Sequence, residues 1–180
     1  MDQLMEVIRK RISIRRYQDK PLTEETVKNI LEAARHAPTA RNLQELEYRV
    51  ITNKALIEQC SEAISAVLKA ENIPAKAPPP GQKFSFFYNA PLLIIITGKK
   101  ENPWSATDSA LAAQNIMLCA TSLGLGSVFI GMARFLEKDR QIMKKLKIAD
   151  DRTIAATVIC GYPDEKPEPK EKKLVAEYLK

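Results

Sequence analysis

Two arginines flank a serine near the start of the chain, and this spacing suits the binding of a phosphate group. Arg11, Ser13 and Arg15 alternate with Ile12 and Ile14, so in an extended segment the three polar side chains point to the same side. Guanidinium groups donate forked, charge-assisted hydrogen bonds to phosphate oxygens. The segment therefore predicts a phosphate clamp, although a solvated basic turn after a helix has the same composition.

A second segment could bind a flat heterocycle. Residues 37–44 read Ala-Pro-Thr-Ala-Arg-Asn-Leu-Gln and lie between an amphipathic helix and a strand. The amides of Asn42 and Gln44, together with exposed backbone, can pair with the donors and acceptors at a ring edge. An ordinary helix-to-strand loop is the alternative. His36, just before it, could contact a cofactor or simply complement the dipole of the preceding helix.

A third segment contains glycines around an apolar strand. Gly124 and Gly126 do not form the dinucleotide-binding fingerprint, because they end a helix instead of beginning one. Gly131 follows the strand and leaves room for a ligand to approach the backbone.

Side chains for direct catalysis or metal binding are scarce. The sequence has a single histidine and three isolated cysteines, and their spacing forms neither a zinc site nor an iron–sulfur site. We find no Ser/His/Asp arrangement, no paired carboxylates at an obvious spacing and no P-loop. We therefore expect no metal and no catalytic side chain, and any catalysis must rest on a cofactor.

Alternating helical and strand periods position these segments. We expect helices beginning near Leu4, after the N-caps Thr23 and Asn53, over Ser105–Leu123, and around Phe135, Ile142, Met143 and Leu146. We expect strands over Leu46–Ile51, Leu92–Thr97, Ser127–Ile130 and Thr153–Cys160. The Ser105–Leu123 helix is apolar on nearly every side, which is typical of a domain centre or a dimer interface. The Pro-rich residues 72–82 favour a lid or surface loop, and the aromatic residues at 84 and 86–88 favour core over acceptor stacking.

Length and charge limit the class of protein. The chain has 180 residues and a net charge of +6, which predicts one domain over residues 1–180 with a C-terminal arm over about 162–180. The apolar end of that arm, from Leu174 to Leu179, is expected to dock on another surface, and a partner subunit is one candidate for it. We expect a cytoplasmic protein, with no membrane association and no nucleic-acid partner, because apolar runs are short and basic residues are interspersed with acidic ones.

Together these segments resemble the nitroreductase family of FMN-dependent oxidoreductases. The resemblance runs from Arg11-x-Ser13-x-Arg15 through residues 37–44 and Gly124-Leu125-Gly126 to Phe129-Ile130-Gly131. It also includes Asp108 and Gln114-Asn115 in the long helix, and Gly161-Tyr162-Pro163 before the Lys- and Pro-rich tail. One departure is that Glu45-Leu46 follow Gln44 where many members have Pro-Trp.

The resemblance implies an α+β fold: a mostly antiparallel sheet flanked by helices, with the long central helix at the interface of a homodimer. It implies two FMN sites at that interface, with cofactor-binding residues Arg11, Ser13, Arg15, Lys170 and Lys172 at the phosphate and ribityl end, Pro38, Thr39, Ala40, Asn42 and Gln44 from the other subunit, and Phe129, Ile130 and Gly131 beside the ring.

The implied activity is the ping-pong transfer of two electrons from NADH or NADPH to a small flat acceptor such as a nitroaromatic or a quinone. Three alternatives stay open: a flavin enzyme of the same fold with another acceptor, for example in enone reduction or dehalogenation; a flavin-binding storage or sensor module; and a cofactor-free basic protein that binds nucleic acid.

Overall fold

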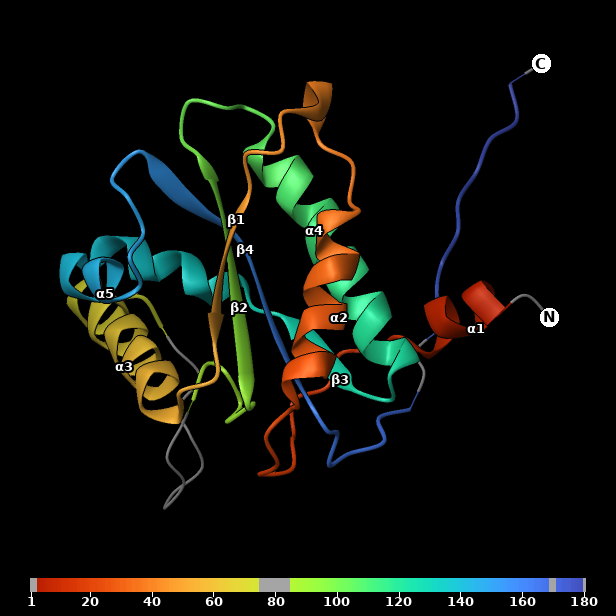
Figure 1. Cartoon of the computed structure of the whole chain (residues 1–180), viewed down its shortest axis with the longest axis horizontal. Coiled ribbons are helices and arrows are strands. Elements are labelled where there is room, and N and C mark those ends of the chain that lie inside the picture. The colour runs from red at the N-terminus through yellow and green to blue at the C-terminus, as the bar shows by residue number, and fades with distance from the viewer. Residues whose placement is uncertain (1–2, 75–84, 169–170, 180) are drawn as a thin grey trace.

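Four antiparallel strands form the centre of the molecule in the order β1-β2-β4-β3. The computed structural model describes residues 3–74, 85–168 and 171–179. The strands are β1 (Glu47–Ile51), β2 (Leu92–Lys99), β3 (Gly126–Phe129) and β4 (Arg152–Gly161). Helices flank this sheet (Figure 1), so the expected α+β class and antiparallel sheet are confirmed.

The structure describes five α-helices. They are α1 (Gln3–Lys10), α2 (Glu24–Arg35), α3 (Lys54–Ala70), α4 (Ser105–Ser122) and α5 (Arg140–Lys145). The Thr23 side chain accepts the Thr26 N–H at 3.2 Å, and the Asn53 side chain accepts the Leu56 N–H at 3.1 Å. Each cap satisfies an N–H group that has no partner within its helix, which confirms both predicted helix starts.

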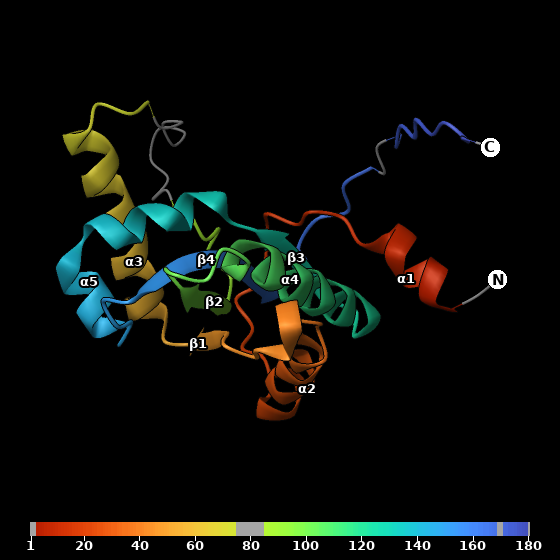
Figure 2. The same ribbon diagram turned by 90° about the horizontal axis from the view of Figure 1, so that it is seen from above.

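The sheet is covered on both faces, which explains its apolar central strand. Leu92, Ile94 and Ile96 of β2 belong to the core under α2 and α4, whereas Leu93 and Ile95 belong to the core under α3 and α5. Figure 2 shows these two pairs of helices on opposite sides of the strands. All five side chains are fully buried, and burial of each contributes about 1.5–3 kcal/mol.

One predicted helix is wrong. The single helix expected around Phe135, Ile142, Met143 and Leu146 is instead a 3₁₀ segment, η2 (Gly131–Lys138), followed by the short helix α5. Asp139 separates them, because its backbone is extended and its carboxylate accepts the N–H groups of Gln141 and Ile142 at 2.9 and 3.1 Å. An aspartate in that geometry is a helix N-cap, and it therefore starts a new helix.

The aromatic cluster before β2 is core where it is described. Phe86 and Phe87 are buried and Tyr88 packs against the same cluster, which confirms the core interpretation for these residues. Phe84 and residues 75–82 of the Pro-rich loop lie outside the described residues.

The three cysteines form no disulfide bond; they are Cys60, Cys119 and Cys160.

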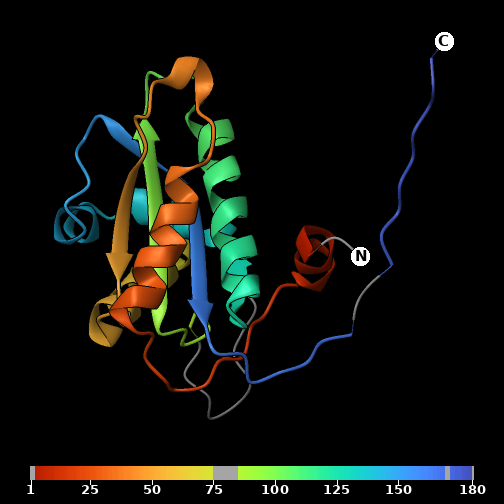
Figure 3. The ribbon, with the colours of Figure 1, turned by 45° about the vertical axis from the view of Figure 1, so that its right-hand side comes forward.

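The two ends of the chain lie apart from the sheet. Helix α1 has no buried residue, and residues 171–179 are all exposed. Figure 3 shows α1 and the C-terminal arm on the same side of the molecule, beyond α4.

Among the described helices, none is long and apolar enough to cross a membrane.

Candidate functional site

The predicted phosphate clamp lines a small basic pocket. Arg11, Ser13 and Arg15 form one wall of a pocket of about 200 Å³, and Lys172 of the C-terminal arm lies on the other wall. Ile12, Pro167 and Glu168 complete the lining. The structure thus brings together four of the residues assigned to the phosphate end, whereas Lys170 lies outside the described residues.

The clamp is held in place by the edge of the sheet. Ser13 pairs with Ser127 of β3 in a parallel bridge, and the Ile14 N–H donates to the Ser127 carbonyl at 3.1 Å. The buried Ile14 side chain packs over Gly126, where an added Cβ would lie only 2.7–2.8 Å from three Ile14 carbon atoms. Glycine at position 126 therefore allows the clamp to approach β3 closely.

Tyr17 closes the end of the clamp segment. Its hydroxyl group donates to the Ile14 carbonyl at 2.6 Å. Burial raises the pKa of the Tyr17 phenol far above its usual value, so the hydroxyl stays protonated and remains a donor. This bond fixes the backbone between Ile14 and Tyr17, from which Arg15 extends to the pocket.

The backbone is open to solvent at the end of β3. Phe129 and Gly131 are exposed and Ile130 is buried between them. The Ile130 N–H donates to the Thr157 carbonyl at 2.9 Å, so that group is already used inside the sheet. Gly131 begins η2, where the first N–H groups have no acceptor within the helix, and a Cβ added at Gly131 would meet nothing within 4 Å. Of the two residues, Gly131 is therefore the better placed to donate to a ligand.

The loop of residues 37–44 has an unusual backbone. Arg41, Asn42 and Gln44 have φ angles of 52°, 55° and 52°, a left-handed region that costs non-glycine residues about 1–2 kcal/mol each. The loop is held by internal bonds: the Gln44 N–H donates to Thr39 Oγ1 at 3.1 Å, and Gln44 Nε2 donates to Asn42 Oδ1 at 2.9 Å. Strain that persists in this way is characteristic of functional loops.

The clamp and this loop lie at opposite ends of α4. The Ala40 N–H donates to Asp108 in the first turn of α4 at 3.0 Å, whereas Ser13 pairs with Ser127, which follows the last turn. At 1.5 Å per helical residue, Asp108 and Ser122 are about 20 Å apart. A single chain therefore does not bring Pro38, Thr39, Ala40, Asn42 and Gln44 to the basic pocket.

His36 is the C-cap residue of α2. Its backbone N–H bonds to carbonyls of the last turn, and its Nε2 lies 3.0 Å from Glu32 Oε1. This is the arrangement expected of a residue at a helix C-terminus.

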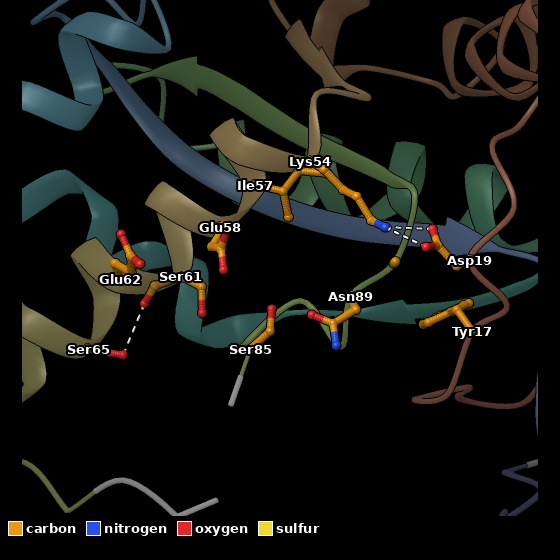
Figure 4. A pocket seen from close by; sticks show the side chains of 11 residues that line it. Tyr17, Asp19, Lys54, Ile57, Glu58, Ser61, Glu62, Ser65, Ser85 and Asn89 are labelled. Carbon is orange, nitrogen blue, oxygen red and sulfur yellow. Dashed lines mark hydrogen bonds and ion pairs between the residues drawn. The ribbon is translucent and has the colours of Figure 1, made fainter. Parts of the chain in front are cut away.

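A second pocket has the opposite chemical character. It measures about 420 Å³ and lies between one face of α3, the segment Tyr17–Asp19 and the turn Ser85–Ala90. Figure 4 shows the ion pair of Lys54 with Asp19, at 2.6 and 2.7 Å, at one end and the carboxylates Glu58 and Glu62 on α3. Because the carboxylates outnumber the ammonium group, this pocket is unsuited to a phosphate.

Three residues near the basic pocket escaped sequence reasoning. Pro167 and Glu168 line it, and Glu165 accepts the backbone N–H groups of Arg15 and Arg16. The only feature of the sequence that points to them is their place in the tail after Gly161-Tyr162-Pro163.

Among the described residues, no group of three or more His, Cys, Asp or Glu side chains could hold a metal ion.

Comparison with known proteins identifies the family. A sequence model of the nitroreductase family matches residues 8–162. A crystal structure of a nitroreductase with bound FMN from Bacteroides fragilis superposes with a TM-score of 0.84, at 25% identity, over 100% of this chain and 98% of that one. An FMN-dependent nitroreductase from Clostridium difficile has a TM-score of 0.74 and 29% identity over 93% of this chain and 91% of its own.

A curated relative gives the same result at the level of sequence. A protein of Archaeoglobus fulgidus, whose name carries the terms NADH dehydrogenase and NAD(P)H nitroreductase, is 29% identical over 92% of this chain and 89% of its own. The family match covers most of the chain, including the clamp, the loop and the end of β3. The chain therefore belongs to the nitroreductase family.

Proposed function

We propose that this protein is an FMN-dependent oxidoreductase that takes electrons from NADH or NADPH and passes them to a small flat acceptor, such as a nitroaromatic or a quinone. Membership of the family, the FMN named for the Bacteroides fragilis structure and the NAD(P)H in the name of the Archaeoglobus fulgidus relative support this assignment. The observation that carries it is the basic pocket, which lies beside the strand that leads to the open backbone of Gly131.

The residues present fit the phosphate end of FMN. Arg11, Arg15 and Lys172 supply three cations and Ser13 a hydroxyl group, against the one carboxylate of Glu168. A phosphate monoester carries about −1.5 to −2 charge at neutral pH, which complements that excess of positive charge. The volume of about 200 Å³ is below the range of about 300–1,000 Å³ that is typical of whole-ligand sites. The pocket therefore suits the phosphate and the adjoining chain, and the ring must lie outside it.

The chain then orients the cofactor from its phosphate to its ring. Ser13 lies beside Ser127, and β3 runs from there toward Gly131, so a ligand anchored at the clamp can extend along β3. The Gly131 N–H would donate to the ring edge. FMN, when bound, supplies the two-electron chemistry, because it takes up a hydride from a reduced nicotinamide and passes it on to the acceptor.

A homodimer would complete each site. The loop of residues 37–44 and the clamp of the same chain lie at opposite ends of α4, so we assign the loop to the ring of the cofactor held by the partner. Large exposed apolar side chains concentrated on three segments of the chain support such an assembly, since extensive apolar surface open to solvent is typical of an interface. They are Leu4, Met5 and Ile8 on α1, Leu111 on α4, and Leu174, Val175, Tyr178 and Leu179 on the arm. The three unpaired cysteines suit a reducing compartment such as the cytoplasm.

The test is a visible absorption spectrum of the purified protein, followed by anaerobic addition of NADH and then NADPH. We expect flavin bands that bleach, and competing nitroaromatic, quinone, enone and halogenated substrates would then rank the acceptors. Flavin bands that persist with both donors would favour a storage or sensor module. A protein that stays colourless after incubation with FMN would refute the proposal.

A substitution in the clamp tests the site itself. Arg15→Ala should weaken FMN binding by about ten- to a hundredfold, because a hydrogen bond to a charged group contributes about 1.5–3 kcal/mol. Arg140→Ala is the matched control, since Arg140 is an exposed arginine on α5 that lines a different cavity. Equal FMN dissociation constants for the two variants would contradict the assignment of the clamp.

A further inference from the structure

The root of the C-terminal arm is attached to the clamp segment by backbone pairing. After β4 the chain runs antiparallel to residues 16–18, where the Gln18 N–H donates to the Tyr162 carbonyl and the Asp164 N–H to the Arg16 carbonyl, both at 2.9 Å. Tyr17 and Pro163 form an antiparallel bridge between these two bonds. The pairing ends at Asp164, just before the part of the arm that reaches the basic pocket.

Glu165 extends this attachment with its side chain. One carboxylate oxygen, Oε1, accepts the backbone N–H of Arg15 at 2.5 Å and that of Arg16 at 3.2 Å. Hydrogen bonds to an ionised acceptor are about twice as strong as neutral ones. Two residues further on, Pro167 and then Glu168 and Lys172 line the pocket opposite Arg11, Ser13 and Arg15. Glu165 is thus the last side chain that joins the two walls before the pocket begins.

We propose that Glu165 is a positioning residue for the phosphate pocket: it holds the backbone of Arg15 and Arg16 to the root of the arm and thereby sets the separation of Lys172 from the clamp. The inference rests on the proposed function. Beyond Glu168 the arm has no buried side chain in the stretch 171–179, so the hydrogen bonds of residues 162–165 to residues 15–18 are the described contacts by which this chain holds the start of the arm beside the clamp.

A role of Glu165 through its charge and a role through its acceptor oxygen predict different effects of substitution on anion binding. If the carboxylate acted only through its charge, its removal by either Gln or Ala would strengthen the binding of an anion. If Glu165 acts by position, Glu165→Gln keeps an oxygen that can accept the same N–H groups, whereas Glu165→Ala loses it. Asp164→Ala is the matched control, because the Asp164 carboxylate is exposed and lies 3.9 Å from the Arg16 guanidinium.

The experiment compares the affinities of FMN and riboflavin for the full-length protein and these three variants. Glu165→Ala should weaken FMN binding by about tenfold or more and leave riboflavin binding unchanged, because riboflavin has no phosphate. Glu165→Gln and Asp164→Ala should bind FMN within about threefold of the unmodified protein. FMN affinity that is unchanged in Glu165→Ala, or an equal loss for FMN and riboflavin, would overturn the proposal.

A second measurement reads the attachment without any flavin. Amide hydrogen exchange at Arg15 and Arg16 should accelerate in Glu165→Ala and stay slow in Glu165→Gln, while the melting temperature reports whether each variant is folded. Rapid exchange of these two amides in the unmodified protein would also overturn the inference. Failure of the unmodified protein to bind FMN would instead refute the proposed function, with the exchange result still testing the attachment.

Discussion

The substitution Gly131→Ala should weaken ligand binding without lowering the stability of the folded protein. In Gly131→Ala the new Cβ meets no atom within 4 Å, and the φ angle of Gly131 lies outside the left-handed region. The folded protein can therefore accept alanine without strain. Because alanine also reduces the conformational freedom of the unfolded chain, the free energy of unfolding should stay the same or rise by about 0.4–1 kcal/mol.

The same methyl group would occupy the space through which the cofactor ring approaches the backbone. Inserting one methyl group into a filled contact costs about 1–3 kcal/mol, which corresponds to a five- to 150-fold weaker FMN complex at about 1.4 kcal/mol per factor of ten. Gly126→Ala is the contrasting variant. Its Cβ would lie 2.7–2.8 Å from three Ile14 atoms, so it should lose about 1–3 kcal/mol of folding stability.

The assays are urea unfolding of the flavin-free proteins and fluorescence titration with FMN. Gly131→Ala should unfold at the midpoint of the unmodified protein or slightly above it and bind FMN weakly, whereas Gly126→Ala should unfold earlier. FMN affinity that is unchanged in Gly131→Ala would show that the ring does not approach this backbone, and the placement of the ring at the end of β3 would then be wrong.

Three further predictions concern the stability of the fold. Arg152→Ala should cost about 1–3 kcal/mol in urea unfolding, because the guanidinium donates to both oxygens of the buried Thr97 at 3.0 Å, whereas its other partner, Glu47, is half exposed and also pairs with Arg49; an unchanged unfolding midpoint would contradict this. Thr23→Ala should cost about 1 kcal/mol by removing the cap of α2, and Thr23→Ser should recover most of it. Burial raises the pKa of the Cys60 and Cys160 thiols from 9.0 to about 12, so the folded state holds these protons more tightly than the unfolded chain does. The free energy of unfolding should therefore be undiminished below pH 9.0 and fall as the pH rises toward 12. It should fall less steeply in Cys60→Ala, and an equal dependence on pH in the two proteins would refute the raised pKa of the Cys60 thiol.

Local signals were sufficient for most elements of the fold. Thr23 and Asn53 are followed by amphipathic periods, and the continuous apolar run from Leu92 identifies a strand covered on both faces. The break at Asp139 could not be predicted in this way. Apolar residues continue at helical spacing on both sides of it, and only the capping bonds of its carboxylate show that a second helix starts there.

The site was predictable where it depends on neighbours in sequence. The alternation of Arg11, Ser13 and Arg15 identified one wall of the basic pocket. The contact of Glu165 with Arg15 joins residues 150 positions apart, and no local pattern encodes such a pair. The use of the Ile130 N–H by the Thr157 carbonyl depends likewise on the pairing of distant segments.

The basic pocket has one consequence for the integrity of the whole chain. Its lining joins Arg11, Ser13 and Arg15 to Pro167, Glu168 and Lys172, and exposed segments such as α1 and residues 171–179 are where local unfolding and proteolysis usually begin. An anion bound there acts as a cross-link between these two segments, because neither can detach without breaking its contacts with the anion. Occupancy should therefore protect α1 and the arm from endoproteases together, and loss of the ligand should expose both segments to cleavage.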